Sequence, residues 1–204
     1  MDYRWFLLGA KFEAFVYAQN LFSPEECREI IYTGTNKDLA TKDAATVGGA
    51  QGSDPYKKEE DLSYRRSKIS WIRSDVEKNE WIFQRITGAL LDLNKQFYNF
   101  DIDHIENLQF TEYDSSYEGF YGKHIDIGYK SSRMRKLSFT IQLTEESSYD
   151  GGDLCLYYSE DATVMSKEQG TMTVFPSFAV HEVEPVKRGT RYALVGWAVG
   201  PPFK

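Results

Sequence analysis

The stretch Leu137-Ser138-Phe139-Thr140-Ile141-Gln142-Leu143 alternates apolar and polar side chains along its whole length. Successive side chains of an extended strand point to opposite faces, so this pattern predicts a strand with one apolar face and one hydrogen-bonding face. Ordinary half-exposed strands show the same alternation. The stretch therefore indicates the fold class without assigning a function.

The period of two recurs through the second half of the chain. Turn signals such as Asp150-Gly151-Gly152 and Arg188-Gly189 separate the segments. We expect strands at residues 105–113, 119–126, 136–143, 153–158, 171–175 and 191–199, with earlier ones within 3–19 and at 65–72. Many short strands predict a mostly β fold, a double-sheet jelly roll rather than a parallel α/β sheet.

Two helices are expected to flank this β core. Ser23 and Glu26 form the pattern of a capping box and Pro24 suits the first helical position, which predicts a helix that Gly34 ends. Residues 75–97 carry apolar side chains at spacings of three and four, which predicts a longer helix packed against a sheet.

Bulk properties exclude several classes of protein. A chain of 204 residues with 41% hydrophobic residues is most simply one domain, 1–204. The net charge of −7 does not favour binding to nucleic acid. Two cysteines, Cys27 and Cys155, are too few for a disulfide scaffold and are expected to be buried free thiols. Without a signal-peptide pattern or an apolar run of membrane-spanning length, we expect a soluble, cytoplasmic protein.

Residues 36–63 offer little to bury. They are small, polar or charged, with Gly48, Gly49 and Gly52 among them. A segment of this kind in a compact domain is either disordered or functional, so we expect a flexible loop that could serve as a lid.

The chemistry of the chain centres on His124 and Asp126. In a strand these side chains, two apart, share one face. The chain has three histidines, and His181 follows His124 at a distance that leaves room for further strands. Two imidazoles and one carboxylate with open positions are the arrangement expected of non-haem Fe(II) oxygenases.

The last expected strand carries a cation among apolar neighbours. Arg191 shares its strand face with Ala193, Val195 and Trp197. A buried guanidinium needs an anion and matches a carboxylate. That carboxylate could belong to an internal Asp or Glu or to an external ligand.

Together these residues resemble the iron(II)- and 2-oxoglutarate-dependent dioxygenases, and within them the prolyl 4-hydroxylase-like group. The resemblance rests on His124-x-Asp126, His181 and Arg191. It extends to the surrounding motifs over about residues 20–200, which are Ser23-Pro24-Glu25-Glu26-Cys27, Arg65-Arg66-Ser67 before Trp71, Leu108 to Tyr113, Tyr149 to Leu154 and Val186 to Tyr192. An ordered set of this kind is far more specific than the His-x-Asp pair alone.

The resemblance implies a double-stranded β-helix in which His124, Asp126 and His181 hold Fe(II). It further implies that Arg191 binds the far carboxylate of 2-oxoglutarate with Tyr113, Thr140 and Gln142, where Tyr121 or Tyr117 could replace Tyr113. The reaction would consume O2 and release succinate and CO2, with ascorbate as reductant. Trp197 and Tyr121 would line the substrate pocket, although Trp197 could equally be a core residue.

Asp126 favours hydroxylation, because related halogenases replace this carboxylate with a small residue. Trp197 stands where nucleic-acid demethylases of this superfamily carry a second Arg. The expected reaction is hydroxylation of a peptidyl proline or a similar side chain. A free amino acid or other small molecule is the alternative substrate, and a non-catalytic jelly-roll binding module is the alternative of a different class.

Overall fold

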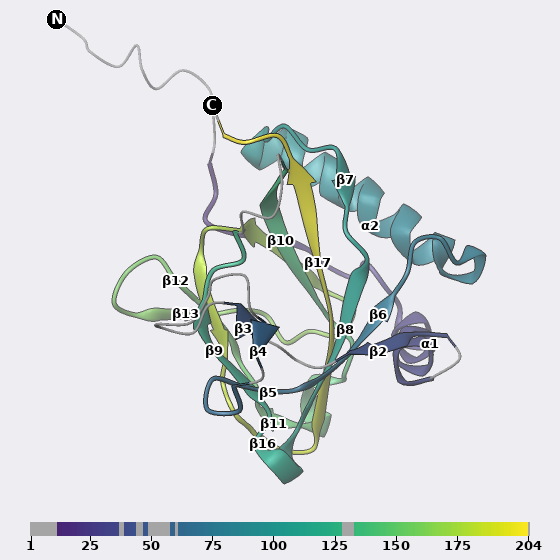
Figure 1. Cartoon of the computed structure of the whole chain (residues 1–204), viewed down its shortest axis with the longest axis vertical. Helices are drawn as coiled ribbons and strands as arrows, with labels where there is room; N and C mark the ends of the chain where they lie inside the picture. The colour runs from purple at the N-terminus through teal and green to yellow at the C-terminus, as the bar shows by residue number, and fades with distance from the viewer. Residues whose placement is uncertain are drawn as a thin grey trace, which may run out of the picture.

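The computed structural model of the chain describes residues 12–36, 39–43, 47–48, 58–59, 61–127 and 133–203. Two antiparallel sheets face each other, and helices cover the outside of the larger one (Figure 1). This mostly β arrangement confirms the expected fold class. No helix among the described residues is long and apolar enough to cross a membrane.

The larger sheet has eight strands. Its order is β1 (Val16–Ala18), β14 (Met172–Pro176), β10 (Met134–Gln142), β17 (Thr190–Gly200), β8 (Leu108–Asp114), β6 (Lys68–Ile72) and β2 (Thr41–Asp43), with β7 (His104–Ile105) also paired to β17. The smaller sheet has the order β13 (Ala162–Val164), β12 (Leu154–Tyr157), β15 (Val180–Val183), β9 (Phe120–His124) and β5 (Arg65–Arg66). Two further pairs are β3 (Val47–Gly48) with β4 (Lys58–Glu59) and β11 (Asp150–Gly151) with β16 (Val186–Arg188).

The first helix, α1 (Pro24–Thr35), begins as the sequence predicts. The Glu26 backbone N–H donates to the Ser23 hydroxyl at 3.2 Å, and the Ser23 N–H donates to the Glu26 carboxylate at 2.8 Å. The expected end at Gly34 is wrong, because the helix continues to Thr35. Gly34 is instead a packing position, since a Cβ there would lie 2.2 Å from Cγ of the buried Phe110 ring.

We expect Gly34→Ala to lower the free energy of unfolding by about 1–3 kcal/mol, because the added methyl overlaps a core ring that cannot move freely. Gly88→Ala is the matched control, since Gly88 is also helical and nothing lies within 4 Å of an added Cβ. There the better helix propensity of Ala should stabilise the protein by up to about 1 kcal/mol. Urea unfolding of both variants measures the difference. Equal shifts would contradict the packing role of Gly34.

The second helix, α2 (Glu80–Leu93), lies inside the expected span of 75–97. A 3-10 turn (Glu77–Asn79) precedes it and a π-helical turn (Asn94–Tyr98) follows it. Further 3-10 turns occur at Ser115–Tyr117 and Glu146–Ser148. The main apolar core joins both helices to the outer face of the larger sheet, with Ile30, Ile86, Leu90, Phe139 and Ile141 among its members.

The apolar side chains of β10 enter this core, so its polar side chains face the smaller sheet. A second, smaller apolar cluster lies between the sheets and includes Tyr113, Leu156, Phe175 and Val183. The space between the sheets therefore holds both apolar residues and the hydrogen-bonding face that the sequence predicts for β10.

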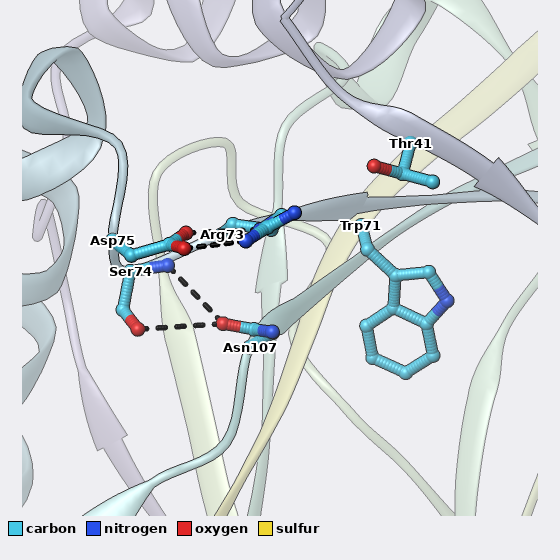
Figure 2. Close-up of a pocket in the computed structure, with 6 residues that line it drawn as sticks. All are labelled: Thr41, Trp71, Arg73, Ser74, Asp75 and Asn107. Carbon is cyan, nitrogen blue, oxygen red and sulfur yellow. Dashed lines mark hydrogen bonds and ion pairs between the residues drawn. The ribbon is translucent and has the colours of Figure 1, made fainter.

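Residues 65–72 join the two sheets. The sequence predicts one strand here, but the structure divides it, because β5 pairs with β9 in the smaller sheet while β6 pairs with β8 in the larger one. Between them, Nε of Arg65 donates to the hydroxyl of Ser67 at 2.8 Å. A pocket opens where β6 ends, at Trp71 and Arg73 (Figure 2).

Other expectations can be placed on the structure. Cys27 and Cys155 are free and buried, as predicted, and burial raises the pKa of each thiol to about 11. The third histidine, His104, which the sequence pattern connects to neither of the others, is exposed and lies in β7. Much of the 36–63 loop lies outside the described residues, and its described part includes β2, β3 and β4.

Candidate functional site

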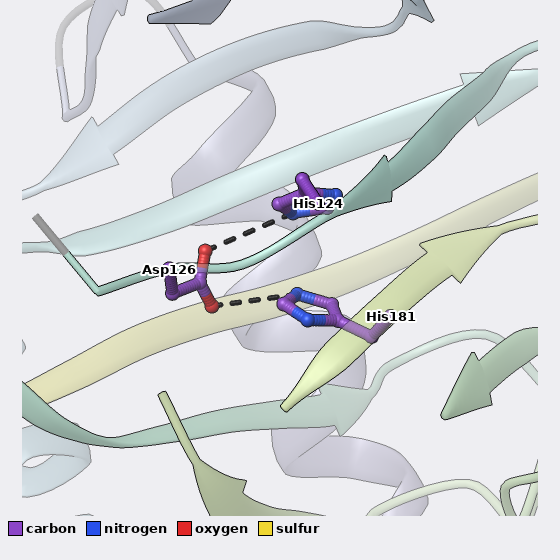
Figure 3. Close-up of side chains that lie close together, drawn as sticks. All are labelled: His124, Asp126 and His181. Carbon is purple, nitrogen blue, oxygen red and sulfur yellow. Dashed lines mark ion pairs between the residues drawn. The ribbon is translucent and has the colours of Figure 1, made fainter. Parts of the chain in front are cut away.

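The structure brings together three side chains that could hold a metal ion: His124, Asp126 and His181 (Figure 3). His124 ends β9 and is paired in register with His181 on β15, a short strand that the sequence pattern does not predict. Asp126 follows β9, where its backbone N–H donates to the carbonyl of Ser177 at 2.9 Å. The pairing of β9 with β15 therefore places side by side two histidines that lie far apart in the sequence.

The possible ligand atoms of these three residues lie within 4.8 Å of one another. Nε2 of His124 is 3.7 Å from Oδ1 of Asp126, and Nε2 of His181 is 3.4 Å from Oδ2. The two imidazole rings have centroids 4.1 Å apart. One cation placed between them could contact all three side chains.

Backbone carbonyls orient both imidazoles. Nδ1 of His124 lies 2.7 Å from the carbonyl oxygen of Gly122, and Nδ1 of His181 lies 2.9 Å from that of Ala179. A proton on each Nδ1 would leave each Nε2, which lies on the side of Asp126, available to bind a metal ion. This is the usual way in which a protein fixes the tautomer of a metal-binding histidine.

The charges of the site also suit a cation. Burial, with the nearby His181, lowers the pKa of His124 to about 3, so this ring is neutral. Burial alone would raise the pKa of Asp126, but the charge and hydrogen bond of His181 hold it well below its usual range. For His181, burial lowers the pKa and Asp126 more than offsets it, so the pKa is raised. The buried Asp126 carboxylate is thus stabilised by positive charge beside it, a role that a bound cation could take over from His181.

A hydroxyl pair supports Asp126 from the larger sheet. The Ser138 hydroxyl donates to Oδ2 of Asp126 at 2.7 Å and lies 2.9 Å from the Ser177 hydroxyl. Trp197, paired with Ser138 across the sheet, is buried and close enough to lower the pKa of Asp126. Its indole nitrogen nevertheless has no hydrogen-bond partner among the described residues. Trp197 is therefore both buried and adjacent to the site.

On the other side of the triad, Tyr121 stacks on His124 with ring centroids 3.6 Å apart. The guanidinium of the buried Arg65 lies 4.4 Å from the centroid of the Tyr121 ring. Sequence reasoning singled out Tyr121 but missed the role of Arg65 in holding it.

Deeper between the sheets, Arg191 is fully buried. Its Nε donates to Oε1 of Gln142 at 3.1 Å, whereas both terminal guanidinium nitrogens have no hydrogen-bond partner among the described residues. No ion pair joins Arg191 to a carboxylate in that part of the chain. Of the two partners left open by the sequence, an internal carboxylate is therefore not found.

Two further buried hydroxyls are also unsatisfied. The Tyr149 hydroxyl has no hydrogen-bond partner within the described part of the chain, and neither has the hydroxyl of Thr173. Burial raises the pKa of Tyr149 and the nearby Arg191 opposes the rise. Thr140 pairs in register with Thr173. Such orphaned groups indicate a ligand site, because an unpaired buried polar group is costly.

Tyr149 was missed by sequence reasoning, which considered three other tyrosines. Tyr113 is paired in register with Arg191, and its ring centroid lies 5.4 Å from the guanidinium carbon. Tyr117 is engaged elsewhere, since its hydroxyl donates to the carbonyl of Glu112 at 3.0 Å. Tyr121 stacks on His124 of the triad. The hydroxyl of Tyr149 is thus a buried donor without a partner among the described residues, and sequence reasoning did not consider it.

These residues fit Fe(II) and a dicarboxylic co-substrate. Two neutral imidazoles and one carboxylate are the donor set of the 2-His-1-carboxylate centre. The two terminal guanidinium nitrogens of Arg191 have no partner among the described residues and match the two oxygens of one carboxylate. The unsatisfied hydroxyls of Tyr149 and Thr173 are further donors for such a co-substrate.

Comparisons with known proteins agree with this chemistry. The model of the 2OG-Fe(II) oxygenase superfamily matches residues 108–199, a span that contains the triad and Arg191. A PKHD-type hydroxylase of Prochlorococcus marinus strain NATL2A is 30% identical over 87% of this chain and 75% of the relative. One from Gloeothece citriformis is 37% identical over 64% of this chain and 72% of the relative. A match to strain MIT 9303 is 39% identical but spans only 42% of that relative's length.

Solved structures support the fold. A prolyl-4-hydroxylase from Pseudomonas putida superposes with a TM-score of 0.71 at 20% identity, covering 93% of this chain and 94% of that one. A prolyl hydroxylase from Trichoplax adhaerens, in complex with a peptide fragment of the hypoxia inducible factor oxygen degradation domain, gives a TM-score of 0.69 at 19% identity. It covers 91% of this chain and 83% of that one.

Proposed function

The chain belongs to the 2OG-Fe(II) oxygenase superfamily, among the PKHD-type hydroxylases, and on that premise we propose that it is an Fe(II)- and 2-oxoglutarate-dependent hydroxylase of a polypeptide side chain. A peptidyl proline is the first candidate for the target. One observation carries the proposal. A preformed His-Asp-His cluster and a buried guanidinium with two free nitrogens face the same space between the sheets.

We assign His124, Asp126 and His181 to hold the metal through two Nε2 atoms and one carboxylate. Bound Fe(II) would supply O2 activation coupled to oxidative decarboxylation of 2-oxoglutarate. Ser138 keeps Asp126 in place by donating to Oδ2, and the carbonyls of Gly122 and Ala179 hold the two rings. These contacts fix the ligands before the metal binds.

Arg191 would bind the far carboxylate of 2-oxoglutarate with its two free nitrogens. Gln142 orients the guanidinium by accepting from Nε, so its role is to position Arg191. Tyr149 and Thr173 would donate their hydroxyls, while Tyr113 and Thr140 line the same face of the site. Because this space is buried, each hydrogen bond is stronger than it would be in water.

Trp197 and Tyr121 would border the position of the target C–H bond, since one adjoins Asp126 and the other stacks on His124. Their rings exclude water from the metal and offer flat apolar faces to a substrate side chain. The peptide complex of the Trichoplax adhaerens relative supports a polypeptide as the substrate class.

The test is turnover of 2-oxoglutarate by purified protein with Fe(II), ascorbate and O2. Without a peptide substrate we expect slow, metal-dependent succinate formation. A proline-containing peptide that the enzyme accepts should speed up succinate formation and gain 16 Da. Free proline and other amino acids are tested in the same assay as small-molecule substrates. Absence of metal-dependent succinate would refute the oxygenase assignment, and a mass gain confined to free amino acids would refute the polypeptide substrate.

A further inference from the structure

A shallow, open hollow lies on the larger sheet where β6 ends. It is a pocket of about 440 Å³ (Figure 2). Six residues line it: Thr41, Trp71, Arg73, Ser74, Asp75 and Asn107. They come from β2, from the end of β6 and the turn after it, and from the segment between β7 and β8. None of them belongs to the groups assigned above to the metal or to 2-oxoglutarate.

The pocket continues the inner surface of the larger sheet. Trp71 lies opposite Gln109 on β8, and Gln109 lies opposite Val195 on β17. The ring of Trp71 reaches that of Trp197, with centroids 6.4 Å apart and planes inclined by 45°. Since Trp197 adjoins Asp126, two indole rings connect the pocket to the metal ligands.

The walls of the pocket are fixed by hydrogen bonds. The backbone N–H and the hydroxyl of Ser74 both donate to Oδ1 of Asn107, at 3.1 and 3.4 Å. Nε of Arg73 donates to Asp75 at 2.9 Å, and Asn79 donates to the carbonyl of Arg73 at 3.0 Å. A pocket held in this way can bind a ligand with little ordering of its own side chains.

The pocket also presents unused hydrogen-bond donors. Nδ2 of Asn107 has no partner in the described chain, and it points away from Ser74, toward the side of Trp71 (Figure 2). The Thr41 hydroxyl is likewise without one among those residues. Asp75 neutralises Arg73, so the pocket has no excess positive charge and does not suit a phosphate. Amide and hydroxyl donors beside a flat indole suit an uncharged peptide segment, whose carbonyl oxygens accept and whose side chain packs on the ring.

We infer that this pocket receives a residue that flanks the hydroxylation target in an extended polypeptide substrate, an inference that rests on the proposed function. Two strand spacings of about 4.8 Å separate β17, which carries Trp197, from β6, so a substrate chain that passes Trp197 would run at least roughly 10 Å across the sheet to reach the pocket. An extended chain covers that distance in about three to five residues. Substrate selection would then depend on the sequence at that distance from the target.

A peptide length series tests the inference by turnover. Peptides with one target proline are lengthened one residue at a time on each side. For the native protein, kcat/KM should rise about tenfold once the peptide extends three to five residues beyond the proline on one side. A gain of this size is expected because the added residues form one or two hydrogen bonds and a ring contact. Trp71→Ala and Asn107→Ala should remove that gain and leave short peptides little affected.

Arg28→Ala is the matched control for Arg73→Ala, because both arginines form exposed ion pairs with a carboxylate within three residues. We expect the length gain to survive Arg28→Ala and to fall in Arg73→Ala. If the pocket variants slow short and long peptides equally, their role is only structural and the inference fails. A length gain that survives Trp71→Ala and Asn107→Ala overturns it as well.

Direct binding separates this inference from the proposed function. With 5-fluorotryptophan in the protein and Mn(II) in place of Fe(II), the ¹⁹F resonance of Trp71, assigned through Trp71→Phe, should shift with long peptides and not with short ones. Peptides that bind and shift only the Trp197 resonance would overturn the pocket while leaving the proposed function intact. If no peptide binds although succinate forms, the polypeptide substrate and the pocket assignment both fail.

Discussion

Asp126→Ala is expected to weaken Fe(II) binding by more than about 100-fold and to abolish metal-dependent succinate formation. Loss of a residue that merely supports a metal ligand costs about 10–100-fold in affinity, so loss of the only anionic ligand should exceed that range. The two remaining imidazoles would have to hold a divalent cation without a compensating negative charge. Titration with Fe(II) under anaerobic conditions, followed by succinate assays, measures both effects.

Graded variants make this prediction specific. His124→Ala and His181→Ala should behave like Asp126→Ala, whereas Ser138→Ala should lose only about 10–100-fold, since it removes a hydrogen bond to Asp126 and no ligand. His104→Ala is the matched control because His104 is exposed in β7, away from the cluster. Unchanged Fe(II) affinity in Asp126→Ala, or equal losses in Ser138→Ala and His124→Ala, would contradict the ligand assignment.

The sequence alone predicts much of this site, because its main residues occur in regular strands. His124 and Asp126 share a face through the period of two, and the same period places Ser138, Thr140 and Gln142 together on β10. Strand alternation cannot predict the pairing of His124 with His181, because register between strands depends on contacts far apart in the chain. The resemblance to a known family supplied that link.

Residues in turns could not be predicted in this way. Tyr149 precedes Gly151 and Gly152, which have φ of +71° and +62° and turn the chain back toward Arg191. A Cβ on Gly152 would lie 2.8 Å from Cγ2 of Val186 and 3.1 Å from Cδ of Arg191. The missing side chain at Gly152 therefore leaves room for the side chain of Arg191. The alternation of residues along a strand does not predict this contact. Gly34 was misread for a similar reason, since its packing against Phe110 is tertiary.

Arg191→Met is expected to have opposite effects on stability and on co-substrate binding. The guanidinium is fully buried, and its one hydrogen bond to a described residue runs from Nε to Gln142. A buried charge without an ionic partner is costly, and replacement by an apolar side chain of similar length removes that cost. We therefore expect Arg191→Met to raise the Tm of the ligand-free protein by several degrees, since about 1 kcal/mol shifts Tm by roughly 2–4 °C at this size.

The same substitution should raise the Kd and KM for 2-oxoglutarate at least about 30-fold, because truncating one partner of a buried charge pair costs about 2–5 kcal/mol. Fe(II) affinity should not change, since Arg191 does not contact the triad. Thermal unfolding with and without 2-oxoglutarate measures both effects, because a ligand that binds the folded state raises Tm, and at a given ligand concentration the rise is larger for tighter binding. Arg85→Met is the control: Arg85 pairs with Glu26 at 2.6 Å on the surface, so its loss should lower Tm slightly and leave 2-oxoglutarate binding intact. A lower Tm in ligand-free Arg191→Met, with unchanged 2-oxoglutarate affinity, would mean that the guanidinium serves the fold and that the co-substrate carboxylate binds elsewhere.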